Sequence, residues 1–229
     1  MRRSVLLLCT YAPRPQFLTL IRELIAYPFA YIVVVDDGSP KKCEPVFEEL
    51  VRHKEVRLFR HSSNLGIGAA IKTGFRRLVA DNDSDSIICS DADGQHAPGD
   101  VWRVTQACER NPEAVVLGSR VFSQHVPLPN RIGNLATARI FEKLKGVKLR
   151  DTQTGLRGFP AKYVSELCVI PQNRYDYETA QLLKLLQMNV PIHELEIATI
   201  YNDDRDSHFN PLLDFYRIYR VLFDSWWGS

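Results

Sequence analysis

The chain has 229 residues, of which 45% are hydrophobic and 24% are charged, and its formal net charge is +2. This composition is that of a folded protein with a substantial core, and it excludes a disordered or fibrous chain. A basic stripe interleaved with aromatic residues is missing, so we expect no nucleic-acid partner. The five cysteines are widely spaced and form no C-x-x-C pair, which argues against a disulfide framework or a zinc site and favours the cytoplasm.

The order of apolar segments predicts an α/β fold. Strand-length apolar runs alternate with segments of helical period, which is typical of a mostly parallel central sheet flanked by helices in a single domain. In chain order, the expected strands are residues 5–9, 31–35, 56–59, 87–90, 114–118 and 192–200. The expected helices are residues 17–26, a segment starting near 45, and residues 67–78, 98–110, 129–145 and 177–188. No window approaches the ~18 apolar residues of a membrane span, so we expect a soluble or surface-bound chain.

Two carboxylates one residue apart, Asp91 and Asp93, directly follow the apolar run at 87–90. Residues two apart on an extended strand point to the same side, so both can converge on one cation. Gln95 adds a neutral oxygen, and Mg²⁺ or Mn²⁺ accepts such a set while leaving its other positions to water and phosphate. An alternative interpretation is a polar turn, because Asp and Gly are common turn residues.

A second acidic pair, Asp36 and Asp37, follows the strand expected at 31–35. Parallel strands bring their carboxyl ends to one edge, where open α/β sheets bind ligands. Either carboxylate can accept hydrogen bonds from a nucleotide base or ribose. We therefore expect both acidic loops at one ligand-binding edge.

Residues 210–229 differ from the rest of the chain in their content of aromatic and large apolar side chains, with Arg217 and Arg220 among them. We treat them as an amphipathic C-terminal helix attached to a catalytic domain of residues 1–209. Two interpretations stay open: a helix that lies in a membrane interface, or a closing helix that packs on the domain.

Several motifs in order resemble the family 2 glycosyltransferases that transfer a sugar to a polyprenyl phosphate, the dolichyl-phosphate mannose synthase type. The resemblance covers nearly the whole chain, and its motifs are VVVDDGSP (33–40), NLGIGAAIKTGF (64–75), SDADGQHAP (90–98), GSR (118–120), DTQTGLRGF (151–159), RYDYE (174–178) and DDRDSHFNP (203–211). It implies a GT-A fold and an inverting, metal-dependent hexosyl transfer from a UDP- or GDP-sugar to undecaprenyl or dolichyl phosphate. Such an enzyme would serve cell-envelope glycan synthesis at the cytoplasmic face of the membrane.

The resemblance also implies roles for particular residues. The metal ligands would be Asp91, Asp93 and Gln95. Catalytic residues would be Asp93 and the residues that hold the phosphates and the sugar, namely Arg120, Arg131, Arg205, Asp151 and Glu178. Nucleotide-sugar contacts would come from Tyr11, Asp36, Asp37, Lys72, Asp91, Ser207 and His208.

Departures from the family pattern leave some alternatives open. The first loop reads Thr10-Tyr11-Ala12-Pro13-Arg14 in place of the usual P-A-Y-N-E, so the nucleotide base is not determined. Many relatives continue into transmembrane helices after the NP segment, so this chain either works peripherally, with its tail and a membrane protein partner, or lacks such a part. A soluble or polysaccharide acceptor and a non-catalytic binding module are the competing functions.

Overall fold

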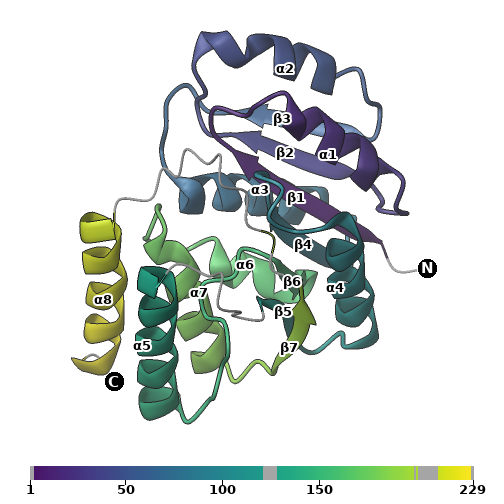
Figure 1. Ribbon diagram of the computed structural model, residues 1–229. Coiled ribbons are helices and arrows are strands. Elements are labelled where there is room, and N and C mark those ends of the chain that lie inside the picture. The colour runs from purple at the N-terminus through teal and green to yellow at the C-terminus, as the bar shows by residue number, and fades with distance from the viewer. Residues whose placement is uncertain (1–2, 121–127, 199, 201–210, 228–229) are drawn as a thin grey trace.

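The computed structural model describes residues 3–120, 128–198, 200 and 211–227, with some side chains of the helices at 128–145 and 211–227 excepted (Figure 1). The strands in this part are β1 (Ser4–Thr10), β2 (Ile32–Asp36), β3 (Val56–Arg60), β4 (Ser86–Asp91), β5 (Val115–Arg120), β6 (Arg157–Pro160) and β7 (Ile192–Ile197). The helices are α1 (Gln16–Ile25), α2 (Glu44–Leu50), α3 (Ile67–Asp81), α4 (Pro98–Arg110), α5 (Leu128–Lys145), α6 (Val164–Leu167), α7 (Asp176–Gln187) and α8 (Pro211–Trp227).

The strands form one sheet in the order β3-β2-β1-β4-β6-β5-β7. All of them run in the same direction except β6, which is antiparallel to both of its neighbours. The predicted α/β fold with a mostly parallel sheet in a single domain is therefore confirmed. The carboxyl ends of β1, β2, β4 and β5 meet at one edge, as expected for parallel strands.

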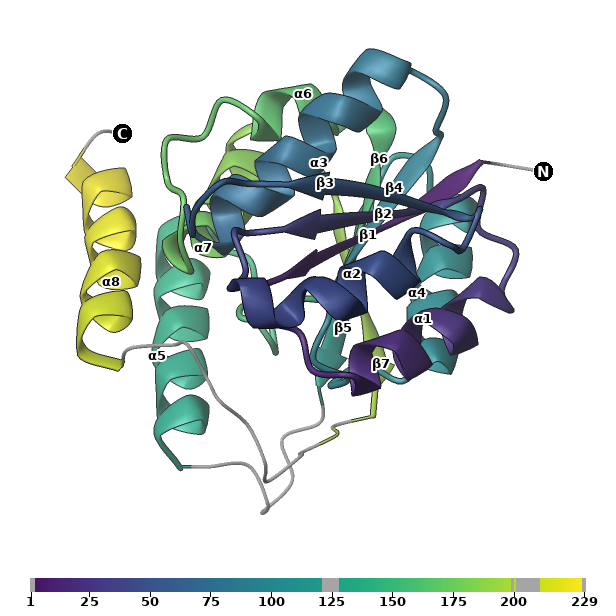
Figure 2. The same ribbon diagram turned by 90° about the horizontal axis from the view of Figure 1, so that it is seen from above.

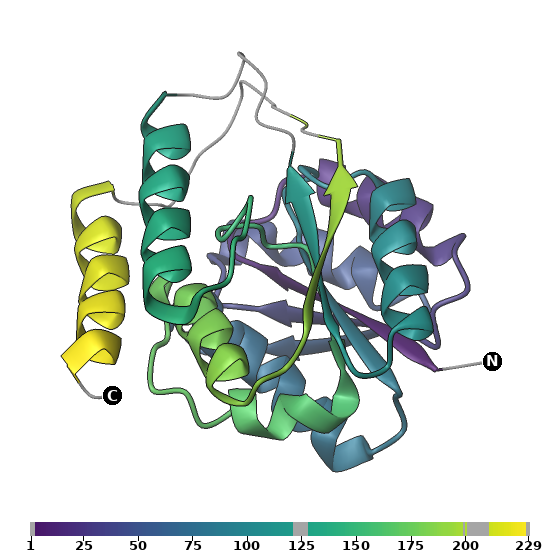
Figure 3. The same cartoon turned by 90° about the horizontal axis from the view of Figure 1, so that it is seen from below.

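Helices cover both faces of the sheet (Figures 1 and 2). One face is buried under α1, α2 and α4, whose apolar residues pack with alternate residues of β1, β2 and β4. The opposite face is buried under α3, α6 and α7. Helices α5 and α8 lie side by side in all three views, beyond α7 (Figure 3). Ile218 and Leu222 of α8 join the core of that second face.

Strand β6 was not predicted from the sequence. This strand has only four residues and includes Gly158 and Pro160, so it lacks the apolar run that marks the other strands. Gly158 is tightly packed, because a Cβ there would lie 3.0 Å from Cβ of Cys108 on α4. The antiparallel direction of β6 has a consequence for the site: the segment that precedes it, residues 151–156, arrives at the carboxyl edge of the parallel strands.

The other predicted elements are confirmed, with small shifts at their ends. The predicted face of α3 is buried through Ile71, Phe75 and Leu78, and the helix ends at Asn82 with a left-handed backbone, φ 46°. The predicted tail helix is present as α8. Within the described part of the chain, every helix is too short or too polar to cross a bilayer.

Candidate active site

The acidic loops and Arg120 gather at the carboxyl edge of the sheet. Asp36 ends β2, Asp91 ends β4 and Arg120 ends β5. Strand register places Asp36 opposite Thr10 and Asp91 opposite Cys9, so both acidic loops flank the end of β1. The predicted common edge is therefore confirmed for these residues.

Asp91 occupies a defined position between two neighbours. Its Oδ2 lies 3.2 Å from Nε2 of His96, whose side chain is 1% exposed. On another side, a Cβ at Gly155 would lie 2.3 Å from Oδ2 and 2.5 Å from Oδ1 of Asp91, so only glycine fits there. Burial raises the pKa of Asp91, but the hydrogen bond and charge of His96, with Arg120 and Arg157, outweigh it and hold the pKa below its usual value.

Asp93 and Gln95 form a separate, more exposed part of the same loop. The carboxylate of Asp93 accepts hydrogen bonds from the backbone N–H of Gln95 at 3.0 Å and from its side-chain amide. The side chain of Gln95 thus lies beside Asp93, where its amide oxygen can serve as a neutral ligand. All three predicted metal ligands come from one short loop.

The donors in this loop fit a magnesium-type ion. Within the described residues, no three His, Cys, Asp or Glu side chains form a complete metal cluster. Mg²⁺ and Mn²⁺ do not need one, because they commonly bind one or two carboxylates and take their other ligands from water and substrate phosphates. The carboxylate oxygens of Asp91 fill the place that a Cβ of Gly155 would take, so this carboxylate lies directly against the Gly155 backbone.

Arg120 is held rigidly by Asp151. Its Nε and Nη2 donate to the two carboxylate oxygens of Asp151 at 2.6 and 3.0 Å, a bidentate arrangement. Asp151 is 0% exposed, whereas the Arg120 side chain is 19% exposed. Asp151 also accepts the backbone N–H groups of Arg120 and Gln153. Asp151 therefore fixes the direction of Arg120, whose exposed part supplies the positive charge of this side of the edge.

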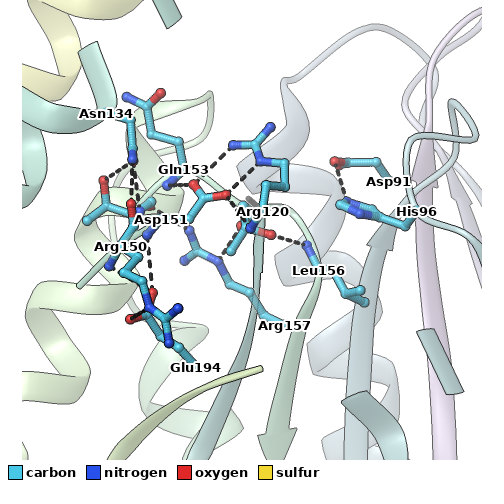
Figure 4. Close-up of polar contacts among 12 residues, drawn as sticks. Asp91, His96, Arg120, Asn134, Arg150, Asp151, Gln153, Leu156, Arg157 and Glu194 are labelled. Atoms are coloured by element: carbon cyan, nitrogen blue, oxygen red, sulfur yellow. Dashed lines mark hydrogen bonds and ion pairs between the residues drawn. The ribbon is translucent and has the colours of Figure 1, made fainter. Parts of the chain in front are cut away.

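The loop that carries Asp151 is braced from both sides (Figure 4). Asn134 of α5 donates to the carbonyl of Arg150 at 2.7 Å and accepts the N–H of Thr152 at 2.9 Å. Glu194 of β7 accepts the N–H groups of Arg150 and Asp151 at 2.9 and 3.1 Å. These bonds connect α5 and β7 directly to the position of Arg120.

Arg157, which was not predicted as a site residue, is a fully buried cation at the start of β6, 1% exposed. It pairs with Cys89 of β4 on one side and with Leu117 of β5 on the other. Its guanidinium donates to the carbonyls of Thr152, Thr154 and Glu178 and to Oε1 of Gln181, at 2.8 to 3.1 Å. Its signal was the arginine within DTQTGLRGF, which the resemblance used only as part of a motif.

Glu178 and Tyr175 belong to the same acidic region. Burial is the main cause that raises the pKa of Glu178 to about 7; Arg157 and Arg120 oppose this, and Asp91 adds to it. Tyr175, not predicted as a site residue, lies close enough to Glu178, Asp91 and Asp214 that their charges add to burial in raising its pKa to about 12. The first turn of α8, which contains Asp214, thus lies near the acidic edge.

The first acidic pair is already engaged within the protein. Asp36 is buried and accepts the N–H of Ser39 at 2.9 Å and Nε of Arg60 at 3.0 Å. Asp37 accepts the N–H groups of Leu65 and Gly66 at 2.9 and 2.8 Å and lies 2.7 Å from Nδ1 of His61. Both carboxylates shape the loops at this edge, and a direct contact with a nucleotide stays a prediction.

The structure does not bring Lys72 to the site. Its ammonium is buried and donates to the carbonyls of Ile170 and Gln172, both at 2.7 Å. Lys72 thus fixes the segment before α7 against α3, and we do not retain it as a nucleotide contact. Tyr11 does lie at the edge, directly after β1, and the neighbouring N–H of Ala12 donates to Oγ of Ser39 at 2.8 Å.

The remaining predicted residues cannot be placed. Arg205, Ser207 and His208 lie outside the described residues. Arg131 lies in α5, but its side chain is outside the described part. Their assignments stay predictions.

A model described as Glycosyl transferase family 2 matches residues 7–166. The chain belongs to glycosyl transferase family 2. Relatives include a UDP-N-acetylglucosamine–dolichyl-phosphate N-acetylglucosaminyltransferase of Methanococcus voltae, 27% identical over 95% of this chain and 94% of the relative. A polyprenol monophosphomannose synthase of Mycolicibacterium smegmatis is 28% identical over 72% of this chain and 64% of the relative.

Solved structures of two sugar-phosphoglycerate synthases share the fold. Mannosyl-3-phosphoglycerate synthase from Rubrobacter xylanophilus superposes with a TM-score of 0.74 at 16% identity, covering 96% of this chain and 73% of that one. Glucosyl-3-phosphoglycerate synthase from Mycobacterium tuberculosis, solved with Mn²⁺, UDP and its product, gives 0.73 at 14% identity, covering 97% and 79%. These matches confirm the predicted GT-A-like architecture of this glycosyltransferase.

Replacement of Arg157 tests how much this buried cation contributes to the stability of the fold. Arg157→Met would leave the bonded carbonyls without their donor and the acidic edge without its internal positive charge, so we expect the free energy of unfolding in urea to fall by about 3–5 kcal/mol. Arg52→Met, at an arginine whose side chain is 74% exposed, should change it by less than about 0.5 kcal/mol. Equal effects in the two variants would contradict this role of Arg157.

The raised pKa of Glu178 predicts a pH dependence of stability. At pH values between the ordinary glutamate pKa and about 7, Glu178 keeps its proton in the folded state but has released it in the unfolded state. Stability contributed by the neutral form is therefore lost as the pH rises through this window. Glu178→Gln should flatten the decrease in unfolding free energy between about pH 5 and 8. Glu48→Gln, at an exposed position of α2, should leave the slope as it was; an unchanged slope in Glu178→Gln would contradict the assignment.

Proposed function

We propose that this protein transfers a sugar from a nucleotide diphosphate sugar to the phosphate of a polyprenyl phosphate, with inversion at the anomeric carbon and with Mg²⁺ or Mn²⁺. The main observation in favour is the pairing of a carboxylate loop, Asp91 and Asp93, with a fixed arginine, Arg120, at the same sheet edge. The relatives named as dolichyl- and polyprenyl-phosphate sugar transferases support the acceptor class.

The proposed reaction needs little proton chemistry. A phosphate monoester has its second pKa at ~6, so the acceptor is mostly a dianion at neutral pH and requires no strong base. One of its oxygens forms the bond to the anomeric carbon, while the bond from that carbon to the donor diphosphate breaks and the diphosphate leaves with the electron pair. A divalent ion supplies positive charge to the leaving diphosphate.

The protein's own residues would then place the two anions. Asp91 and Asp93, with Gln95, are suited to hold the ion that binds the donor diphosphate. Arg120, aligned by Asp151, presents a planar guanidinium that can grip phosphate oxygens in pairs. Arg131, Arg205, Ser207 and His208 remain proposed phosphate contacts, and Asp36, Asp37 and Tyr11 remain proposed contacts of the nucleotide.

An exposed apolar face beside the site suits a lipid acceptor. Of the nine large hydrophobic side chains that are exposed in the described part, five lie on the adjacent helices α5 and α8: Leu135, Leu213, Tyr216, Tyr219 and Phe223. Four of these are spaced along α8 at 213, 216, 219 and 223, as on one side of a helix. Leu135 also neighbours Asn134, which holds the Asp151 loop. We propose that this α5–α8 face lies on the membrane, peripherally at its cytoplasmic side.

Activity is tested by incubating the protein with MnCl₂, a polyprenyl phosphate and each of a panel of UDP- and GDP-sugars, then extracting the product into organic solvent. We expect one donor to give a lipid-linked sugar. Asp93→Asn should reduce turnover by at least about 100-fold, because loss of even an outer-shell partner of a metal typically costs ~10–100-fold.

The matched control is Asp81→Asn on α3, whose carboxylate is 45% exposed and pairs with Arg57. It should turn over like the unaltered protein. Full activity of Asp93→Asn would contradict the metal role. Donor consumption with a product that stays in the aqueous phase would favour a soluble acceptor. If the donor is not consumed and the protein shows no metal-dependent nucleotide binding, a non-catalytic module would be favoured.

The membrane face is tested by sedimentation with vesicles of phosphatidylcholine and phosphatidylglycerol. The double variant Tyr216→Ser/Phe223→Ser removes two side chains that are 64% and 58% exposed. Burial of such a side chain is worth ~1.5–3 kcal/mol, so binding should weaken by about tenfold or more. Val169→Ser, at a side chain 73% exposed between α6 and α7, should bind as before. Equal binding of the double variant would contradict the membrane role of this face.

A further inference from the structure

His96 is a buried polar side chain whose surroundings satisfy only part of it. It directly follows the loop that carries Asp91, Asp93 and Gln95, and it is 2% exposed. Its Nε2 lies 3.2 Å from Oδ2 of Asp91, whereas its Nδ1 has no hydrogen-bond partner among the described residues. A buried imidazole nitrogen without a partner is unfavourable. A purely apolar side chain would avoid this penalty, so the imidazole needs another reason to occupy this position.

The one hydrogen bond of His96 acts on Asp91. A carboxylate oxygen only accepts, so Nε2 of His96 is the donor in this contact. The backbone of Gly155 closes another side of the same carboxylate, since no Cβ would fit there. His96 engages Oδ2, the oxygen of Asp91 that faces the interior imidazole. The carboxylate thus has a fixed orientation before any ligand binds.

Asp93 lies in the exposed part of the same loop. Two hydrogen bonds reach its carboxylate from Gln95, two residues away. A local bond of this kind moves with the loop, whereas the His96 ring is anchored in the interior. The hydrogen bond to Asp91 therefore comes from the protein interior, whereas these two bonds to Asp93 come from the loop itself.

We propose that His96 is a positioning residue that orients Asp91 for a divalent cation. This inference rests on the proposed function, since it assigns Asp91 to the cation. Carboxylate ligands of metals are commonly held by such outer hydrogen bonds, and their removal typically weakens metal binding by ~10–100-fold. Without the bond from Nε2, Asp91 could rotate and would have to be reordered when the ion binds.

The test compares His96→Leu with His96→Gln. Leucine keeps an apolar volume but removes both ring nitrogens, whereas glutamine places an amide N–H near the position of Nε2. Bound Mn²⁺ is measured by electron paramagnetic resonance with UDP, and separately with GDP. We expect His96→Leu to bind Mn²⁺ ~10–100-fold more weakly and His96→Gln to recover most of the affinity. The thermal midpoint of His96→Leu should stay the same or rise, because the unpartnered Nδ1 is removed.

The matched control is His53→Leu. His53 also has a buried ring nitrogen, Nε2, without a partner among the described residues, but it lies between α2 and β3, at the opposite edge of the sheet. This variant should bind Mn²⁺ like the unaltered protein. Native Mn²⁺ affinity in His96→Leu, or no recovery in His96→Gln, would overturn the positioning role alone. Failure of the unaltered protein to bind Mn²⁺ with either nucleotide would overturn the proposed metal site and this role together.

Discussion

The buried guanidinium of Arg157 is the interaction on which the acidic edge depends. Asp91, Asp151 and Glu178 lie close enough for their charges to act on one another, and burial alone disfavours such a group of anions. Arg157 places a permanent cation near them. Its hydrogen bonds go to backbone carbonyls and a side-chain amide, so its charge is not paired with a single carboxylate. Together with the larger effects of His96 and Arg120, it lowers the pKa of Asp91 against the effect of burial, and it opposes the burial that raises the pKa of Glu178. The same edge therefore shifts the pKa values of these two carboxyl groups in opposite directions.

The direction of β6 explains why Arg157 lies close to Asp151 and to Arg120, which Asp151 holds. A parallel strand at this place would bring its following loop to the edge, whereas antiparallel β6 brings the segment before it. That segment carries Asp151, which fixes Arg120 on the neighbouring strand, and Gly155, which borders Asp91. Arg157 begins the strand itself. This strand and the loop before it thus connect the carboxylate side of the edge to the arginine side, and Asn134 of α5 and Glu194 of β7 hold that loop.

The sequence was sufficient for the parallel strands, the helices that cover them and the acidic loops at their ends, because these features are local patterns. It was insufficient wherever a role depends on contacts between distant segments. Arg157 could be recognised as a buried cation only after β6 was placed between β4 and β5. Lys72 matched a family motif, yet its ammonium bonds carbonyls about a hundred residues further along the chain. His96 was part of a quoted motif, but its contact with Asp91 depends on how the loop folds back after β4.

The two acidic pairs show how the fold distinguishes carboxylates that look alike in the sequence. A buried carboxylate is tolerated when donors surround it, and each donor it already has lowers its gain from a further cation. Asp37 faces the N–H groups of Leu65 and Gly66 and the ring of His61, and Asp36 faces Ser39 and Arg60. Among the described residues, the side chain that donates to Asp91 is His96, and Asp93 is exposed. The first pair therefore stabilises the loops that surround it, while Asp91 keeps oxygen capacity for an ion, and this difference favours the second loop as the metal site.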